Sequence, residues 1–331
     1  MNTTHEENSK MKRALITGLD GQDGSFLAEL LLSKGYEVHG LIRRGVNPLV
    51  NIEHLRDTPI VLHYGDLATE NHLMLLIAEL TPHEIYHLAG QSDVAASFEI
   101  PEYTGDITGL GVTRLLEAIR RFSPRSKLYQ ASSSEMFGNA PPPQNEETPF
   151  TARSPYGAAK IYAHNMVRCY REAYGLFASC GILFNHESER RGLNFVTRKI
   201  SNAAARISLG LQDKLELGNM TARRDWGYSP DYVRAMWMML QQDEPSDYVV
   251  GTGKIHSVQD FVAAAFGHVG LDWQDYVVGG MASSVRPSDI SYLLADPTKA
   301  NYELGWTPRV WFDELVTIMV DHDLKLNKEG K

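Results

Sequence analysis

The sequence predicts an α/β protein built on a doubly wound parallel sheet, with a smaller C-terminal α/β region. Three observations lead to this fold class. Short β-rich runs alternate with amphipathic helical stretches through the first half of the chain. A glycine-rich turn directly follows the first of these runs. The composition is that of an ordinary globular protein, since 43% of the 331 residues are hydrophobic and 22% are charged.

Six runs in the first half are expected to form strands. The amphipathic stretches between them are long enough to cross from one parallel strand to the next, which predicts a Rossmann-like sheet. The expected strands are residues 13–17, 37–42, 60–64, 84–88, 127–131 and 177–184. Helices are expected over 26–33, 71–80 and 111–121, and a further helix is expected to begin at Pro155.

The second half of the chain has a looser pattern of arginine-rich loops. Helices are expected there over 196–209, 231–242 and 312–323. No internal repeat or clear linker separates the two halves, which favours packing around a shared cleft. We therefore expect a polar N-terminal tail over 1–11, a cofactor-binding domain over 12–184 to which later segments can return, and mainly a substrate-binding domain over 185–331.

Composition and charge exclude several functional classes. The net charge of −9, without a basic run, argues against a nucleic-acid partner. The two cysteines, Cys169 and Cys180, lack ligand spacing with histidines, so we expect no metal and two buried thiols. Neither a signal peptide nor an apolar run of ~18 residues is present, which predicts a cytoplasmic protein without a membrane partner.

Three glycines follow the first strand at equal spacing, Gly18, Gly21 and Gly24. Glycine lets the backbone approach a pyrophosphate closely, and the free N–H groups at a helix start receive its negative charge. A tight connection between strand and helix, without any ligand, is the structural alternative.

Two further residues follow the second and third strands. Arg43 stands where NAD-binding chains carry an acidic residue, and an arginine there favours the 2′-phosphate of NADP. Asp66 is placed to hydrogen-bond an adenine ring, although Gly-Asp pairs also form plain turns.

Four residues suggest proton chemistry. Tyr156 and Lys160 lie one turn apart on the helix that Pro155 opens, so the ammonium is expected to lower the pKa of the phenol. Ser133 and Glu135 follow the fifth strand, at the carboxyl edge where ligands of parallel sheets bind, and they face one side if the chain is extended. A helix-capping serine and a surface carboxylate are the structural alternatives.

These motifs together resemble the extended short-chain dehydrogenase/reductase family, whose members act mainly on nucleotide sugars. Within that family the chain is similar to the GDP-mannose 4,6-dehydratases. The narrower resemblance is carried by residues 36–40, 63–67, 185–188, 195–200, 224–227 and 296–300.

The resemblance implies a lyase that uses GDP-mannose and NADP. Tyr156, helped by Lys160 and Ser133, would take the proton of the C4 hydroxyl while hydride passes from C4 to NADP. Glu135 would then remove the C5 proton, water would leave C6, and the hydride would return to C6. The alternatives are a dehydratase, reductase or epimerase for another nucleotide sugar, or a scaffold that holds NADP without turnover.

The resemblance also implies binding residues and an assembly. The NADP-binding set is Gly18, Gly21, Gln22, Asp23, Gly24, Arg43, Asp66, Leu67, Leu88, Gln91, Tyr156, Lys160, His186 and Arg191. The nucleotide-sugar set is Asn185, Arg198, Lys199, Arg224 and Arg286. A homodimer or homotetramer is expected, with pairing through residues 111–121 and 156–174. Asp93 and Tyr228 depart from the family pattern.

Overall fold

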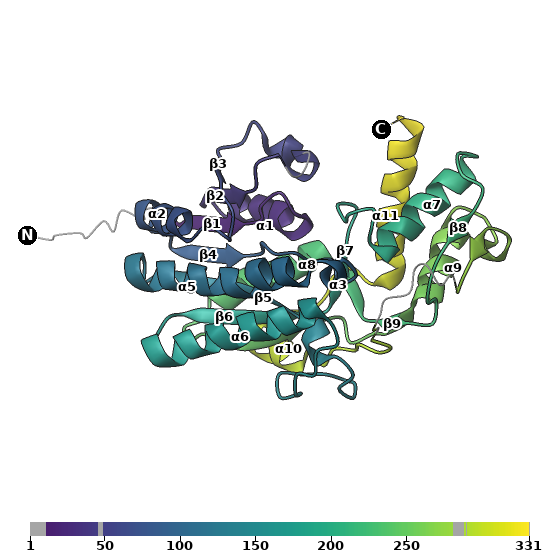
Figure 1. The fold of residues 1–331 in the computed structure, drawn as a ribbon. Coiled ribbons are helices and arrows are strands. Elements are labelled where there is room, and N and C mark those ends of the chain that lie inside the picture. Colours follow the sequence, from purple (N-terminus) through teal and green to yellow (C-terminus); the bar gives the residue numbers. More distant parts are fainter. Residues whose placement is uncertain (1–10, 46–48, 281–287, 289, 331) are drawn as a thin grey trace, which may run out of the picture.

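One seven-stranded sheet organises the chain (Figure 1). The computed structural model describes residues 11–45, 49–280, 288 and 290–330. The strand order is β11-β6-β5-β4-β1-β2-β3, and every neighbouring pair is parallel, so the predicted doubly wound sheet is confirmed. Its strands are β1 (Arg13–Thr17), β2 (Glu37–Ile42), β3 (Val61–Tyr64), β4 (Glu84–His87), β5 (Lys127–Ser133), β6 (Ala178–Leu183) and β11 (Asp247–Val250).

The central strands are apolar and buried on both faces, as a sheet covered by helices requires. The six predicted strands agree with the structure to within one or two residues at each end. The seventh strand, β11, was not predicted. It pairs with β6, but the long segment that contains α7 (Val196–Ser208) and α8 (Ser229–Leu240) separates the two strands in the sequence.

Two helical layers cover the sheet. The α1 (Gln22–Ser33), α8 (Ser229–Leu240) and α10 (Thr298–Leu304) helices contribute apolar residues to the core on one face. The other face is covered by α2 (Glu70–Leu80), α5 (Gly111–Phe122) and α6 (Pro155–Tyr174). The α5 helix continues a run formed by α4 (Pro101–Thr104) and a π-helical segment, Gly105–Leu110, after the short α3 (Ala96–Glu99). Short 3₁₀ turns occupy Leu49–Leu55, Ser134–Phe137 and Trp273–Asp275.

A smaller helical group lies beyond the carboxyl edge of the sheet (Figure 1). It consists of α7 (Val196–Ser208), α9 (Val258–His268) and α11 (Phe312–Lys328), which share a core of their own. Short strand pairs accompany this group: β7 (Asn185–Glu187) with β10 (Trp226–Tyr228), β8 (Leu215–Glu216) with β13 (Val277–Val278), and β9 (Arg223–Arg224) with β12 (His256–Ser257).

The chain after residue 185 therefore serves both parts of the molecule. The α8, β11 and α10 elements complete the sheet and its covering layer, whereas α7, α9 and α11 form the smaller group. No helix in the described ranges combines the length and apolarity that crossing a membrane would need.

Two local expectations were wrong. The α1 helix begins at Gln22 rather than at residue 26, because Gly21 is its N-cap residue and the Gly21 carbonyl already accepts a hydrogen bond from Ser25. Cys169 is exposed on α6, whereas Cys180 is buried in β6 as expected. Cysteine type alone does not reveal which face of a helix a residue occupies.

Candidate active site

A large cleft opens at the carboxyl edge of the sheet, where ligands of parallel α/β proteins bind. Its volume is about 940 Å³, and residues from both the sheet and the chain after residue 185 line it. Every residue predicted for the cofactor or for catalysis lies in this lining: Gly18, Gly21, Gln22, Asp23, Gly24, Arg43, Asp66, Leu67, Leu88, Gln91, Ser133, Glu135, Tyr156, Lys160, His186 and Arg191.

The glycine turn forms a cradle that side chains would fill. Gly18 has a φ of +73°, and a Cβ atom on Gly24 would lie 2.3 Å from the Gly18 carbonyl oxygen. The turn leads directly into α1, whose first N–H groups point out of the helix start. The clash at Gly24 is with the turn's own backbone, so a tight connection already accounts for that glycine. The N–H groups at the start of α1, which lie in the cleft lining, are the feature that suits a diphosphate.

Arg43 and Asp66, the two residues predicted for the adenosine half of a dinucleotide, both line the cleft. The Arg43 guanidinium is exposed and donates a 2.5 Å hydrogen bond to the Tyr103 hydroxyl. The Asp66 carboxylate accepts a hydrogen bond from the Ala68 N–H, so it also forms the plain turn considered as an alternative.

Gln22 and Asp23 are engaged with later parts of the chain. The Asp23 carboxylate lies 2.7 Å from His186 Nε2 and accepts a 2.8 Å hydrogen bond from the Ser229 hydroxyl. Gln22 accepts a hydrogen bond from the Ser188 hydroxyl. The glycine turn is thus tied to the segment that follows β6.

Tyr156 and Lys160 are both buried in the cleft wall formed by α6. The ammonium donates a 2.7 Å hydrogen bond to the Ala131 carbonyl and lies 5.7 Å from the centre of the Tyr156 ring. Burial lowers the pKa of Lys160 to about 8. Burial also raises the pKa of Tyr156 to about 12, despite a hydrogen bond with Ser133, so the expected lowering of the phenol pKa is not found.

Ser133 ends β5, and Glu135 lies in the 3₁₀ turn that follows. The Ser133 hydroxyl accepts a 3.2 Å hydrogen bond from the Glu135 N–H, so serine caps this turn as well as contacting Tyr156. The chain is not extended through Glu135, so the condition under which Ser133 and Glu135 would share one face of a strand is not met. The turn nevertheless keeps the Glu135 side chain, which is 9% exposed, in the cleft lining.

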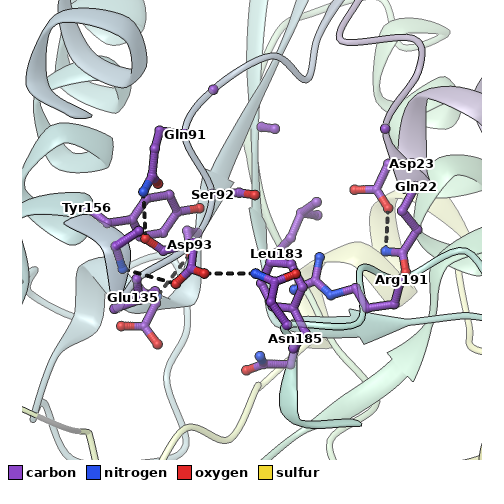
Figure 2. Close-up of a pocket in the computed structure, with 18 of the residues that line it drawn as sticks. Gln22, Asp23, Gln91, Ser92, Asp93, Glu135, Tyr156, Leu183, Asn185 and Arg191 are labelled. Carbon is purple, nitrogen blue, oxygen red and sulfur yellow. Dashed lines mark hydrogen bonds between the residues drawn. The ribbon is translucent and has the colours of Figure 1, made fainter. Parts of the chain in front are cut away.

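The two sides of the cleft come from different parts of the chain. Figure 2 shows Tyr156 and Glu135 on one side, Asn185 and Arg191 on the other, and Asp93 between them. Arg191 stacks on the Phe195 ring at 3.5 Å. The lining also includes two predicted substrate residues, Lys199 and Arg224, which give this side a cationic character suited to a diphosphate.

Two predicted substrate residues are not in the described lining. Arg198 lies outside it, because its buried guanidinium forms an ion pair at 2.7 Å with Asp323 of α11. A buried pair of this kind ties two helices of the smaller group together. Arg286 lies outside the described residues.

Ser92 and Asn194 line the cleft but were not predicted to contact a ligand, whereas Asp93 was singled out as a departure from the family pattern. Ser92 follows β4, and the rule that ligands lie beyond the carboxyl ends of parallel strands would have indicated this segment. Asn194 donates a 2.8 Å hydrogen bond to the Asp93 carboxylate across the cleft. No sequence signal identifies Asn194, because it lies in a loop outside the sheet.

A buried polar cluster lies beside the site. Ligand atoms of His164, Cys180 and Asp247 come within 4.8 Å of one another. The Asp247 carboxylate accepts two hydrogen bonds from Arg171, and His164 is hydrogen-bonded to Ser132. These contacts already give the groups partners, so the cluster is best explained as a link between α6, β6 and β11.

Comparisons with known proteins extend along most of the chain. Residues 15–319 match the family described as GDP-mannose 4,6 dehydratase. The chain is 54% identical over 332 residues to GDP-mannose 4,6 dehydratase 2 of Arabidopsis thaliana, covering 97% of this chain and 89% of that protein. It is 50% identical over 340 residues to the human GDP-mannose 4,6 dehydratase, covering 95% of this chain and 91% of the human protein. A UDP-glucose 4-epimerase of Thermus thermophilus solved with NAD is 27% identical, with a TM-score of 0.83 and coverage of 94% and 98%.

Proposed function

The chain belongs to the GDP-mannose 4,6-dehydratase family, and we propose that it removes water from GDP-mannose with NADP as a recycled hydride carrier. The product is GDP-4-dehydro-6-deoxy-mannose, so the enzyme is a lyase. One observation carries the catalytic part of the proposal. A buried carboxylate, Glu135, shares the cleft with the Ser133, Tyr156 and Lys160 side chains.

The first proton transfer belongs to Tyr156. Its phenolate oxygen takes the proton of the C4 hydroxyl. NADP, which the glycine turn with Gly18, Gly21 and Gly24 would hold, would supply the acceptor for the C4 hydride and its donor to C6. The phenol must ionise despite burial, and the donors available to help are the Ser133 hydroxyl and the nearby Lys160 ammonium.

The second proton transfer belongs to Glu135. The new carbonyl at C4 acidifies the C5 hydrogen, which the carboxylate removes as the C6 hydroxyl departs and is protonated to water. A proton then returns to C5 as hydride reaches C6. Redox equivalents balance within one sugar, so the reaction consumes no NADPH.

A direct assay tests this function. Purified protein is incubated with GDP-mannose and NADP⁺, and the sugar nucleotide is followed by mass spectrometry together with the nicotinamide absorbance. Loss of one water without accumulating NADPH is expected. Net NADPH consumption in a parallel incubation started with NADPH would indicate a reductase, inversion without a mass change would indicate an epimerase, and binding without turnover would indicate a scaffold.

The choice of NADP over NAD is a further part of the proposal. Solved structures of this fold contain NAD or NADPH, and the exposed Arg43 guanidinium is what favours a 2′-phosphate. Arg43→Ala is expected to weaken NADP⁺ binding ~10- to 100-fold, because a hydrogen bond to a charged group is lost, and to leave NAD⁺ binding nearly unchanged. Calorimetric titration with each cofactor measures both. Arg56→Ala is the control, since among the described residues the ion pair of Arg56 is with Glu53, at 3.6 Å. Equal losses for NAD⁺ and NADP⁺ would contradict the assignment.

The cytoplasmic location and the homo-oligomer stay predictions. Exposed apolar side chains on the α5 and α6 layer, Leu110, Phe122, Tyr162 and Tyr174, support pairing of two copies through this face. Light scattering is expected to give at least twice the mass of one chain, and Tyr162→Arg is expected to lower it. Tyr302→Arg, at a fully solvated position on α10, is the matched control. A wild-type mass of one chain would refute the oligomer.

A further inference from the structure

The glycine turn carries a charge of the wrong sign for its proposed ligand. Asp23 lies in the first turn of α1, beside the cradle that Gly18 and Gly24 form. A carboxylate at this position repels a diphosphate and competes with it for the positive end of the helix. The contacts of Asp23 therefore determine whether the turn accepts an anion.

The hydrogen bonds of His186 indicate its charge. Its Nε2 faces the Asp23 carboxylate at 2.7 Å, and its Nδ1 faces the Phe184 carbonyl oxygen at 2.8 Å. Both partners accept hydrogen bonds only, so both ring nitrogens must donate, and the imidazolium alone satisfies this arrangement. The ring is also stacked on Tyr232 at 4.6 Å, which fixes its orientation.

The electrostatics agree with this geometry. Burial opposes the charge on His186, but Asp23 and the hydrogen bond with the Phe184 carbonyl together outweigh it and raise the pKa of the histidine. Burial likewise opposes the charge on Asp23, but His186 and the bonds from Ser229 and Gln22 lower the pKa of Asp23 to about 2. The two groups therefore form a buried ion pair at the edge of the cleft.

We propose that protonated His186 is a positioning residue that neutralises Asp23 and so makes the glycine turn receptive to the diphosphate of the cofactor. Loss of the His186 proton leaves Asp23 as an uncompensated charge next to that diphosphate. The inference rests on the proposed function only in taking the cofactor to be a diphosphate-bearing dinucleotide.

Other charged or titratable groups face this pair from the surrounding elements. Arg191 forms an ion pair with Glu187, with 3.2 Å between Arg191 Nε and the carboxylate oxygen Oε2. Burial lowers the pKa of Lys160 on α6 to about 8, and the Asp23 charge acts in the opposite direction. Lys160 therefore contributes to any pH dependence of the wild type. Burial, with a smaller contribution from the Asp23 charge, raises the pKa values of three tyrosines, which stay neutral at moderate pH: Tyr129, Tyr156 and Tyr232.

The expected sign follows from the raised pKa of His186. A bound diphosphate adds a further anion and raises that pKa again, so cofactor affinity is highest below it and falls as the pH rises through it. A loss of about tenfold in NADP⁺ affinity across the transition corresponds to one unit of difference between the free and bound pKa values.

The test measures NADP⁺ affinity between pH 6 and 9, without sugar nucleotide, for the wild type and two variants. His186→Gln keeps a polar side chain without the charge, and its affinity is expected to be weak, near the high-pH value of the wild type. Asp23→Asn removes the repelling charge, and its affinity is expected to fall less with rising pH than that of the wild type. Titration of NADP⁺ itself is common to all the proteins. Wild type and His186→Gln also share the Asp23 carboxylate that acts on Lys160, so the difference between these two proteins isolates His186.

The chain offers a matched control. His268 Nε2 lies 2.7 Å from an Asp321 oxygen, at the surface between α9 and α11. His268→Gln is expected to keep the wild-type pH dependence. If His186→Gln and Asp23→Asn both weaken binding equally and keep the wild-type slope, the pair is merely structural and the inference fails. Tight NADP⁺ binding without pH dependence in the wild type would also overturn it, while leaving the proposed dehydratase intact.

Discussion

Glu135→Gln is expected to slow the dehydration of GDP-mannose by about 10²- to 10⁴-fold while oxidation at C4 survives. Glutamine fills the same space in the buried turn after β5, but it cannot take the C5 proton. Tyr156, Lys160 and Ser133 remain in place, so the first hydride transfer can still occur. The variant should therefore stop after the first half of the reaction.

This partial reaction has a distinct signature. A single turnover should produce reduced nicotinamide absorbance that persists, together with a sugar nucleotide that has lost two hydrogens but no water. The exposed Glu147, on the loop before α6, provides the control Glu147→Gln, which should behave as the wild type. A Glu135→Gln protein that releases water at the normal rate would disprove the assignment of the second base.

Tyr156→Phe is expected to suppress the reaction at its first step, by about 10²- to 10⁴-fold. Phenylalanine keeps the buried ring against Lys160 but removes the oxygen that takes the C4 proton. Neither reduced nicotinamide nor dehydrated sugar should form, whereas binding of GDP-mannose and NADP⁺ should change little. This result separates Tyr156 from Glu135, whose variant still forms reduced nicotinamide.

Stopped-flow absorbance and calorimetric binding together measure this expectation. Tyr174→Phe, at the exposed end of the same helix, is the control for loss of a phenol oxygen from α6. Appearance of reduced nicotinamide at the wild-type rate in Tyr156→Phe would assign the first proton transfer to another group.

Short-range patterns in the sequence were enough for most of the fold. Alternation of apolar runs located six strands of the sheet, because a buried parallel strand needs nearly continuous apolar residues over a few positions. The glycine turn and the Tyr156–Lys160 pair were found in the same way, since each lies within eight consecutive residues. Such features depend on local backbone geometry, which spacing expresses directly.

The remaining features depend on contacts between distant segments. The β11 strand pairs with β6 across more than one intervening helix, and Arg198 is bound to Asp323 rather than placed in the cleft. Glu135 reaches the cleft through a turn that alternation along a strand does not describe.

The sequence by itself thus determined the succession of strands along the first half of the chain, the glycine cradle, the helix that carries Tyr156 and Lys160, and the chemical types of the groups beyond β5. Only the tertiary structure decided the pKa values and ion pairs of the groups in the cleft. Burial, not the neighbouring ammonium, has the largest effect on the pKa of Tyr156. The Asp23 carboxylate contacts His186, although the two residues are 163 positions apart in the sequence. Periodicity reports the faces of single elements, whereas desolvation and ion pairing arise only when separate elements pack and exclude water.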